Sequence, residues 1–499
     1  MFLSFLLPAL YVGDTKHTAV FTKNGYWCKI KKDEPDPVDN CKTGDSKMAA
    51  QKKEKITNTS ASKRLSDFIR KAVSPYHTVE ESRKLLEAAG FEEVSLDKEW
   101  KIKPNGKYYV LPFKTSLFAF TVPGAGNTSG SKKNGTASKT AGIHIAAAHT
   151  DFPCLHIKPV AEYEGRGYLR VNTEIYGGPI LNTWLDRPLS IAGRVLLKSD
   201  DIYAPREVMV DFKRPLLTIP NLAIHYNREV NDGVKLTKQN DMLPLLGMFD
   251  DKLNKQSYFI DMLAKEIKEK KENILDFDLY VYNAEEPAFI GLDKEMLSAP
   301  RLDNITSCLA LVEGLIGADK ESKNGALNVI ALFDNEEIGS ETKQGADSEL
   351  LRVILKKIYR ALGKDEISLD TDIRKGFLLS VDVAHALHPA KGDKYDPVNN
   401  MRMGDGVTLK LSANQRYTYD GVAVASLQQL CNKYGIKYKK FVNNSDMPGG
   451  GTLGPIISSH LPMYTVDIGV PILAMHSARE LMGVADQDEL VNLMTAFFS

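Results

Sequence analysis

Residues 327–340 read LNVIALFDNEEIGS. Leu327–Phe333 is an apolar run of strand length, and a short apolar run that ends at turn residues is typical of a buried β-strand. Three carboxylates follow the run directly, at Asp334, Glu336 and Glu337. Ligands of open α/β sheets bind beyond the carboxyl ends of the strands. This stretch therefore predicts both an α/β fold and a polar site at one edge of its sheet.

Similar apolar runs recur along the chain. Three of them are predicted as further buried strands: Ile143–Ala148, Phe377–Val383 and Met463–Ile468. Helix-like stretches lie between the runs: Ile305–Ile316, Ser348–Leu362 and Gly421–Tyr434. The alternation favours a parallel or mixed sheet that helices cover on both faces.

Changes in sequence texture predict four segments. Residues 1–60 are lysine-rich and contain prolines, so we expect a mobile N-terminal extension with a short strand around Thr18–Ile30. Residues 61–153 and 293–499 are the two parts of the α/β catalytic domain. Residues 154–292 contain many short β-like runs between turn residues, which predicts an inserted β-rich domain that splits the core.

Composition excludes several classes of protein. The 499 residues include 64 basic and 64 acidic side chains, whereas binders of nucleic acid or anionic membranes need a positive surplus. We therefore expect neither nucleic acid nor membrane as a partner. The apolar stretch Phe2–Tyr11 is too short to cross a bilayer and lacks the basic start of a signal peptide. Five scattered cysteines without a C-x-x-C pair favour a reducing, cytoplasmic location.

Five polar clusters carry the candidate chemistry, and most of them follow an apolar run. They are Ala148–Asp151, Arg301–Asn304, Phe333–Ser340, Val381–Pro389 and Ala474–Glu480. Together they hold at least two imidazoles and five or six carboxylates, which would repel one another without cations. Two divalent ions would neutralise them, and nitrogen and carboxylate ligands suit Zn²⁺, with Mn²⁺ or Co²⁺ as alternatives.

The two-metal hypothesis also divides the acidic residues by role. One carboxylate could bridge the ions, and of Glu336 and Glu337 one could bind metal while the other transfers protons. Each cluster alone has an ordinary explanation. An H-x-D after a strand is usually a polar loop, and Asp382 could cap a helix. Their joint occurrence in this order is what favours a metal site.

The order of the clusters resembles the aspartyl aminopeptidase family of cocatalytic zinc aminopeptidases. The matching motifs are H-x-D, P-R-L-D-N, D-N-E-E-I-G-S, D-x-A-H-A-x-H-P and A-M-H-S-x-R-E, which begin at His149, Pro300, Asp334, Asp382 and Ala474. Further matches lie at Tyr176–Gly178, Thr183–Pro188, Ile219–His225 and Gly451–Pro455. The resemblance runs from about Arg64 to the C-terminus.

The resemblance implies a role for each matched residue. His149 and Glu337 would bind one zinc ion, and Asp382 and His476 the other. Asp303 would bridge the two ions. Glu336 would be the general base, and Asp151 would orient the His149 ring. His225 would reach the active site of a neighbouring subunit and steady the oxyanion, unless it is a buried structural histidine.

The same resemblance implies a fold, an assembly and a substrate class. The fold would be a mixed-sheet zinc-peptidase domain, split by an inserted β-rich, barrel-like dimerisation domain. Dimers would build a tetrahedral homododecamer that admits peptides. Asn414 stands where family members carry a lysine for acidic substrates. Acidic N-terminal residues would then be accepted and neutral ones cleaved too, unless Arg416 or another cation supplies the missing charge.

Two other functions remain open from the sequence. A two-metal carboxypeptidase or deacylase could use Arg301 or Arg416 to hold a substrate carboxylate. A catalytically silent scaffold on the same fold would be favoured by a lost ligand, but every expected ligand is present.

Overall fold

The computed structural model describes residues 17–21, 27–31, 60–124, 142–248, 257–318 and 325–499. Two compact units divide the chain, Met1–Ser60 and Ala61–Ser499. In the first unit, β1 (His17–Phe21) pairs antiparallel with β2 (Trp27–Lys31), so two strands lie where one was expected. The rest of the predicted mobile extension lies outside the described residues.

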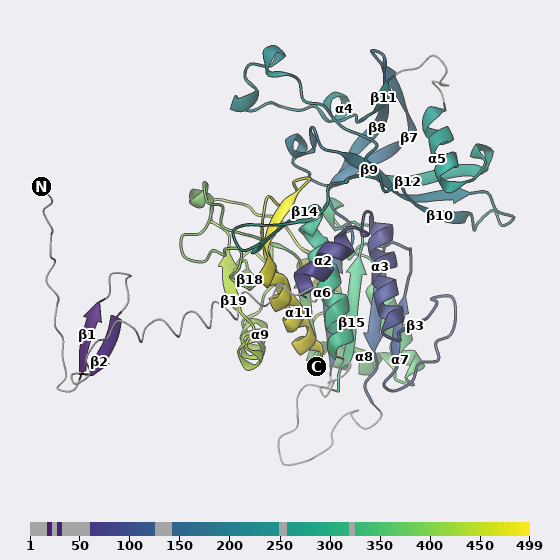
Figure 1. The fold of residues 1–499 in the computed structure, drawn as a ribbon. Coiled ribbons are helices and arrows are strands. Elements are labelled where there is room, and N and C mark those ends of the chain that lie inside the picture. Colours follow the sequence, from purple (N-terminus) through teal and green to yellow (C-terminus); the bar gives the residue numbers. More distant parts are fainter. Residues whose placement is uncertain (1–16, 22–26, 32–59, 125–141, 249–256, 319–324) are drawn as a thin grey trace, which may run out of the picture. The chain divides into compact units, whose positions relative to one another are not determined.

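A nine-stranded mixed sheet forms the centre of the second unit (Figure 1). Its order is β19-β18-β20-β16-β6-β15-β5-β4-β3. The bounds are β3 (Glu92–Glu93), β4 (Lys107–Val110), β5 (Leu117–Thr121), β6 (Ile143–His149), β15 (Leu327–Phe333), β16 (Phe377–Val381), β18 (Val407–Leu411), β19 (Tyr438–Val442) and β20 (Tyr464–Gly469). The strands β20, β16, β6 and β15 are parallel, which brings their carboxyl ends to one edge.

Helices cover both faces of this sheet. Alternate residues of its central strands therefore point into two different hydrophobic cores. Ala146 and Ile330 belong to one core, and Ile145 and Val329 to the other. The first core includes α2 (Ala61–Ile69), α3 (Pro75–Ala88), α6 (Leu302–Ala318), α9 (Gly421–Tyr434) and α11 (Val484–Phe498). The second includes α7 (Leu350–Ala361), α8 (Glu366–Lys375) and α10 (Leu453–His460).

A six-stranded antiparallel sheet occupies the predicted insertion, in the upper part of Figure 1. Its order is β10 (Arg206–Asp211), β9 (Leu189–Leu197), β12 (Ile274–Asn283), β7 (Cys154–Gly165), β8 (Tyr168–Tyr176) and β11 (Leu245–Met248). Residues 217–219 make isolated bridges to both β9 and β11. Two helices belong to the same region, α4 (Lys238–Asp241) and α5 (Tyr258–Ile267).

A five-stranded sheet is built from strands that lie far apart in the sequence. Its order is β13 (Ala288–Ile290), β14 (Met296–Ala299), β22 (Glu480–Gly483), β21 (Pro471–Leu473) and β17 (Ala384–His385). Short 3₁₀ turns complete the fold: η1 (Leu181–Trp184), η2 (Ile224–Tyr226), η3 (Val230–Asp232), η4 (Lys271–Asn273), η5 (Glu336–Ile338) and η6 (Gly392–Lys394). Among the described helices, none is long and apolar enough to cross a membrane.

Candidate metal centre

Three adjacent parallel strands deliver the first group of candidate ligands. His149 is the last residue of β6, Glu336 and Glu337 form the turn η5 after β15, and Asp382 follows β16. Since the sheet order is β16-β6-β15, all four side chains meet at the carboxyl edge. The convergence predicted from the sequence is therefore present in the structure.

Two connections from outside the parallel strands supply the remaining ligands. Asp303 lies at the start of α6, where it and Asn304 depart from helical geometry and are joined by a cis peptide bond. His476 lies in the turn between β21 and β22, with a positive φ of 67°. Both residues depend on local backbone that hydrophobic periodicity does not reveal.

The ligands form two groups that share Asp303. Its Oδ1 lies 3.5 Å from His149 Nε2, and its Oδ2 lies 3.3 Å from His476 Nε2. Asp382 Oδ1 lies 3.5 Å from His149 Nε2. Glu337 Oε2 lies 3.5 Å from His476 Nε2. Two sets of three side chains, each able to hold one ion, are therefore His149, Asp303 and Asp382, and Asp303, Glu337 and His476.

This grouping differs from the division implied by the resemblance, which paired His149 with Glu337 and Asp382 with His476. In the structure Asp382 accompanies His149, and Glu337 accompanies His476. Strand order accounts for Asp382, because β6 lies next to β16 and so brings Asp382 beside His149. A third possible set joins His149 to Glu336 and Glu337, so the Glu336–Glu337 turn lies close to both groups.

The donor set fits divalent cations. Buried oxygens of three carboxylates have no hydrogen-bond partner: Asp303 Oδ1, Glu337 Oε1 and Asp382 Oδ1. Unpaired buried polar atoms are costly, and bound cations would satisfy these oxygens. Two imidazoles and three carboxylates without a thiolate suit Zn²⁺.

Burial and mutual proximity perturb the titration of the cluster. Burial raises the pKa of Glu337 well above its ordinary value, and the Asp303 carboxylate raises it further. Burial likewise raises the pKa of Glu336, to about 8. At His149 burial opposes protonation, but the nearby carboxylates of Asp151, Asp303 and Asp382 outweigh it and raise the pKa. Bound cations would reverse the effect on the acids by stabilising their charged forms.

Asp151 connects one ligand ring to the acidic turn. Its Oδ1 lies 3.3 Å from His149 Nδ1, opposite the nitrogen that faces Asp303. The backbone N–H of Glu336 donates to Asp151 Oδ1 at 3.2 Å, and that of Glu337 to Oδ2 at 3.1 Å. The same His149 Nδ1 is hydrogen-bonded to the Asp151 backbone carbonyl at 3.1 Å. Asp151 therefore orients the imidazole through its backbone and its carboxylate, and the turn through its carboxylate, which extends the role implied by the resemblance.

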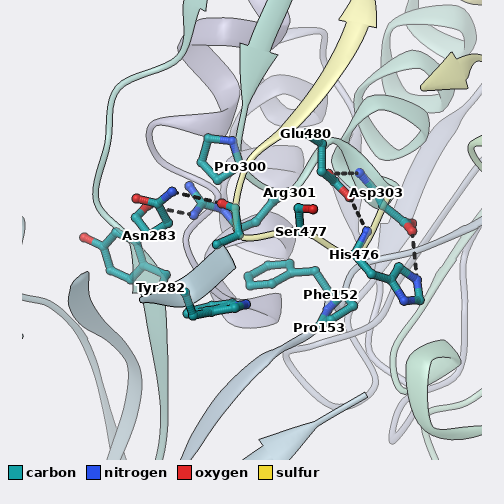
Figure 2. A pocket seen from close by; sticks show the side chains of 12 residues that line it. Phe152, Pro153, Tyr282, Asn283, Pro300, Arg301, Asp303, His476, Ser477 and Glu480 are labelled. Carbon is teal, nitrogen blue, oxygen red and sulfur yellow. Dashed lines mark hydrogen bonds and ion pairs between the residues drawn. The ribbon is translucent and has the colours of Figure 1, made fainter. Parts of the chain in front are cut away.

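Glu480 makes the corresponding connection for the other ligands. Its carboxylate accepts hydrogen bonds from the backbone N–H of Asp303 at 3.1 Å and of His476 at 2.8 Å (Figure 2). Glu480 belongs to a motif matched in the sequence, but no role was expected for it. Within that motif the sequence marks Glu480 only by its position four residues after His476. Its role could not be predicted, because it binds backbone N–H groups, which the residue pattern does not reveal.

A cavity of about 820 Å³ opens beside the cluster. Glu336 lines it and lies 4.0 Å from His149 Nε2, with 18% of its side chain exposed. Besides the candidate ligands His149 and His476, the cationic and imidazole side chains of its lining are Lys391, Lys394, Lys410, His385 and His388. Glu336 therefore lies where a substrate could reach it, next to the ligand cluster.

His225 lies apart from this cluster in the same chain. It is exposed in η2, and the described residues that line the cavity do not include it. The alternative of a buried structural histidine is therefore wrong. An exposed His225 is compatible with a role toward a second subunit, which stays a prediction.

Comparisons with known sequences show the family to which the chain belongs. A model of the aminopeptidase I zinc metalloprotease family (M18) matches residues 68–498. The chain belongs to the M18 family. A probable M18 family aminopeptidase 2 from Clostridium acetobutylicum is 44% identical over 425 residues, which cover 85% of this chain and 95% of that protein. The chain is accordingly a metal-dependent aminopeptidase, a hydrolase that acts on peptide bonds.

Solved structures agree with the M18 assignment. The cryo-EM structure of the Ape4 and Nbr1 complex matches with a TM-score of 0.80 and 33% identity, over 88% of this chain and 85% of that one. The S. cerevisiae mApe1 dodecamer matches with a TM-score of 0.74 and 28% identity, over 88% of this chain and 96% of that one. The mixed α/β fold is thus that of M18 aminopeptidases.

Proposed function

We propose that this M18 aminopeptidase removes N-terminal amino acids from peptides with two divalent ions, most suitably Zn²⁺. One ion would be held by His149, Asp303 and Asp382. The other would be held by Asp303, Glu337 and His476. The observation that carries the proposal is the shared Asp303, whose two oxygens face different imidazoles at 3.5 and 3.3 Å.

The chain's own residues then divide the reaction. Bound zinc would lower the pKa of water and polarise the scissile carbonyl. Glu336 would accept the proton of the attacking water and deliver it to the departing amine, as a general base and then a general acid. Asp151 would fix the position of the His149 ring relative to the Glu336 backbone.

The geometry disfavours the carboxypeptidase alternative. Arg301 donates to the backbone carbonyls of Ile69, Ala72 and Asn283 and is 8% exposed, so its guanidinium is already satisfied. Arg416 is exposed, and the described lining of the cavity includes neither arginine. Neither arginine is therefore placed to hold a substrate carboxylate in this cavity.

A chelator experiment tests the proposed activity. Leucine and aspartate anilides with a free amine should be hydrolysed, and the same anilides N-acetylated should not, because the site would require an N-terminal ammonium or amine. Removing metal should abolish hydrolysis and Zn²⁺ should restore it. Release of acetate from the acetylated anilides would instead support a deacylase.

A lysine of the cavity lining bears on side-chain specificity. Asn414 is exposed and lies outside the described cavity lining. The buried cation of the lining is Lys410, which is 2% exposed and whose Nζ lies 3.4 Å from Asp382 Oδ2. Because the Lys410 ammonium already pairs with Asp382, its attraction for a substrate carboxylate would be weaker than that of an unpaired lysine. We therefore propose that acidic N-terminal residues are accepted and neutral ones cleaved too.

Comparing kcat/KM for Asp-, Glu-, Leu- and Ala-anilides tests this specificity. We expect Asp and Glu to exceed the neutral pair by less than about 10³-fold, which corresponds to about 4 kcal/mol of differential transition-state binding. A larger preference would show that acidic residues are required.

We also propose an assembly. The β-rich segment 154–292 would be an inserted, barrel-like dimerisation domain, supported by the bridges of residues 217–219 to both β9 and β11. Dimers would assemble into a homododecamer, and the matched S. cerevisiae mApe1 is itself a dodecamer. His225 of one subunit would act at the active site of another. The cytoplasmic location expected from the cysteines stays a prediction.

A further inference from the structure

The segment Tyr176–Ile180 runs from the six-stranded sheet to the ligand cluster. Tyr176 is the last residue of β8, and Ile180 directly precedes η1. Gly178 and Ile180 line the large cavity. We call these five residues the 176–180 strap; none of them is a candidate ligand.

The first contact of the strap is the Tyr176 hydroxyl. It donates to Asp151 Oδ2 at 2.7 Å and accepts from Asn335 Nδ2 at 2.8 Å. Asp151 in turn accepts from the backbone N–H groups of Glu336 and Glu337. The Tyr176 hydroxyl, at the end of a strand of the antiparallel sheet, therefore links the Asp151 carboxylate to Asn335, the residue that precedes the Glu336–Glu337 turn.

The second contact is a close approach at Gly177. This residue has a φ of +71°, and a Cβ built on it would lie 3.1 Å from Glu337 Cβ and 3.4 Å from Glu337 Oε2. A side chain here would be strained and would press on a candidate ligand. Glycine thus lets the backbone lie directly against Glu337.

The third contact orients His476. The Gly178 carbonyl lies 3.1 Å from His476 Nδ1, and Ile180 N–H donates to His476 O at 2.9 Å. A carbonyl can only accept, so it favours a proton on Nδ1 and leaves the Nε2 lone pair free. Nε2 is the atom that faces Asp303 and Glu337.

We propose that the 176–180 strap is a positioning device for the ion site of Asp303, Glu337 and His476, a role that rests on the proposed two-metal centre. The strap contacts Glu337 and His476, the two ligands that belong to this ion site alone. It ties them to the six-stranded sheet, so the geometry of one ion site depends on the proposed dimerisation domain. The His149 and Asp382 side chains lack direct contact with the strap among the described hydrogen bonds and ion pairs.

Gly177→Ala tests the close approach, with Gly167→Ala as its matched control. Gly167 lies in the turn between β7 and β8, has a φ of +80°, and a Cβ there meets nothing within 4 Å. Both variants carry the same kind of backbone strain, but only Gly177→Ala presses on Glu337. Zn²⁺ titration against a competing chelator, repeated with Co²⁺ absorption spectra, measures each ion separately.

We expect Gly177→Ala to bind one of two ions about 10–100-fold more weakly, the usual effect of disturbing groups that orient metal ligands, and the other ion as before. Gly167→Ala should bind both ions like the parent protein. Equal affinity for both ions in the two variants, or equal weakening of both ions, would overturn the proposal. A parent protein that binds fewer than two ions would overturn the two-metal centre itself.

Tyr176→Phe keeps the proposal testable if Gly177→Ala does not fold. Its control is Tyr282→Phe, which removes a buried hydroxyl that donates to Asp211 at 2.8 Å within the same region. We expect Tyr176→Phe to lower kcat by about 10-fold or more with little change in KM, since the acidic turn would lose its orientation. The proposal fails if both phenylalanine variants change kcat equally and shift the Co²⁺ spectrum equally.

Discussion

Candidate ligands were predictable from the pattern of the sequence where they directly follow a recognisable strand. Glu336 and Glu337 directly follow an apolar strand, and the structure places them in the turn after β15. Glu480 and Tyr176 could not be assigned in the same way. Both act through backbone N–H groups or carboxylates that only the folded chain brings within reach. The resemblance grouped Glu337 with His149 and Asp382 with His476, whereas the shorter distances join Asp382 to His149 and Glu337 to His476.

Glu480→Gln tests whether Glu480 positions the ligands. Glutamine keeps the volume but offers one acceptor instead of two, so one backbone N–H of Asp303 or His476 would lose its partner. We expect metal affinity to fall by about 10–100-fold. The control is Glu313→Gln on the same helix as Asp303, which removes a partly exposed ion pair with Arg64 and should leave metal affinity unchanged. Unchanged metal content in Glu480→Gln would exclude the positioning role.

Secondary-structure elements were predictable where hydrophobic periodicity is strong. The predicted strand Leu327–Phe333 and the predicted helix Gly421–Tyr434 have the bounds of β15 and α9. The predicted strand Phe377–Val383 runs two residues beyond β16, because Asp382 turns toward the cluster. Strand pairing in the six-stranded sheet is long-range, so the pattern within each strand does not specify its neighbours.

Helix α2 sets the boundary of the folded catalytic unit. Leu65, Phe68 and Ile69 are buried, and Ala61 N–H donates to Asp488 Oδ1 at 3.0 Å. A chain that begins at residue 55 should therefore melt within a few degrees of the full chain and retain its activity. A chain that begins at residue 71 should melt well below both, because burying each large apolar side chain contributes about 1.5–3 kcal/mol. Equal melting temperatures for the two shortened chains would contradict this boundary.

The whole molecule combines a mixed sheet that carries most candidate ligands with an antiparallel sheet whose 176–180 strap contacts Glu337 and His476. The sequence predicted both parts through their different textures. It could not predict how they join, because the 176–180 strap makes contacts between residues up to 298 positions apart. The proposed assembly adds a further level, in which His225 would complete the site of another subunit.

Mixed oligomers test that action between subunits. His225→Phe should lower kcat by about 10²-fold without loss of metal, since it would remove one oxyanion donor. Co-expression with Glu336→Gln subunits should then restore activity, because a mixed two-fold dimer contains one intact site. Random pairing would restore about a quarter of the sites. Activity no higher than the sum of the two separate variants would exclude the contribution of His225 to a neighbouring site.

The most direct test of the account is Glu336→Gln, assayed together with its metal content. Glutamine preserves size but cannot accept the water proton, whereas Glu336 is not needed to complete either ion site. The account predicts two bound ions and a kcat lower by about 10²–10⁴-fold, the usual share of general acid–base catalysis. Near-parental turnover with both ions bound would contradict the role of Glu336 as the proton-transferring group of this metal centre.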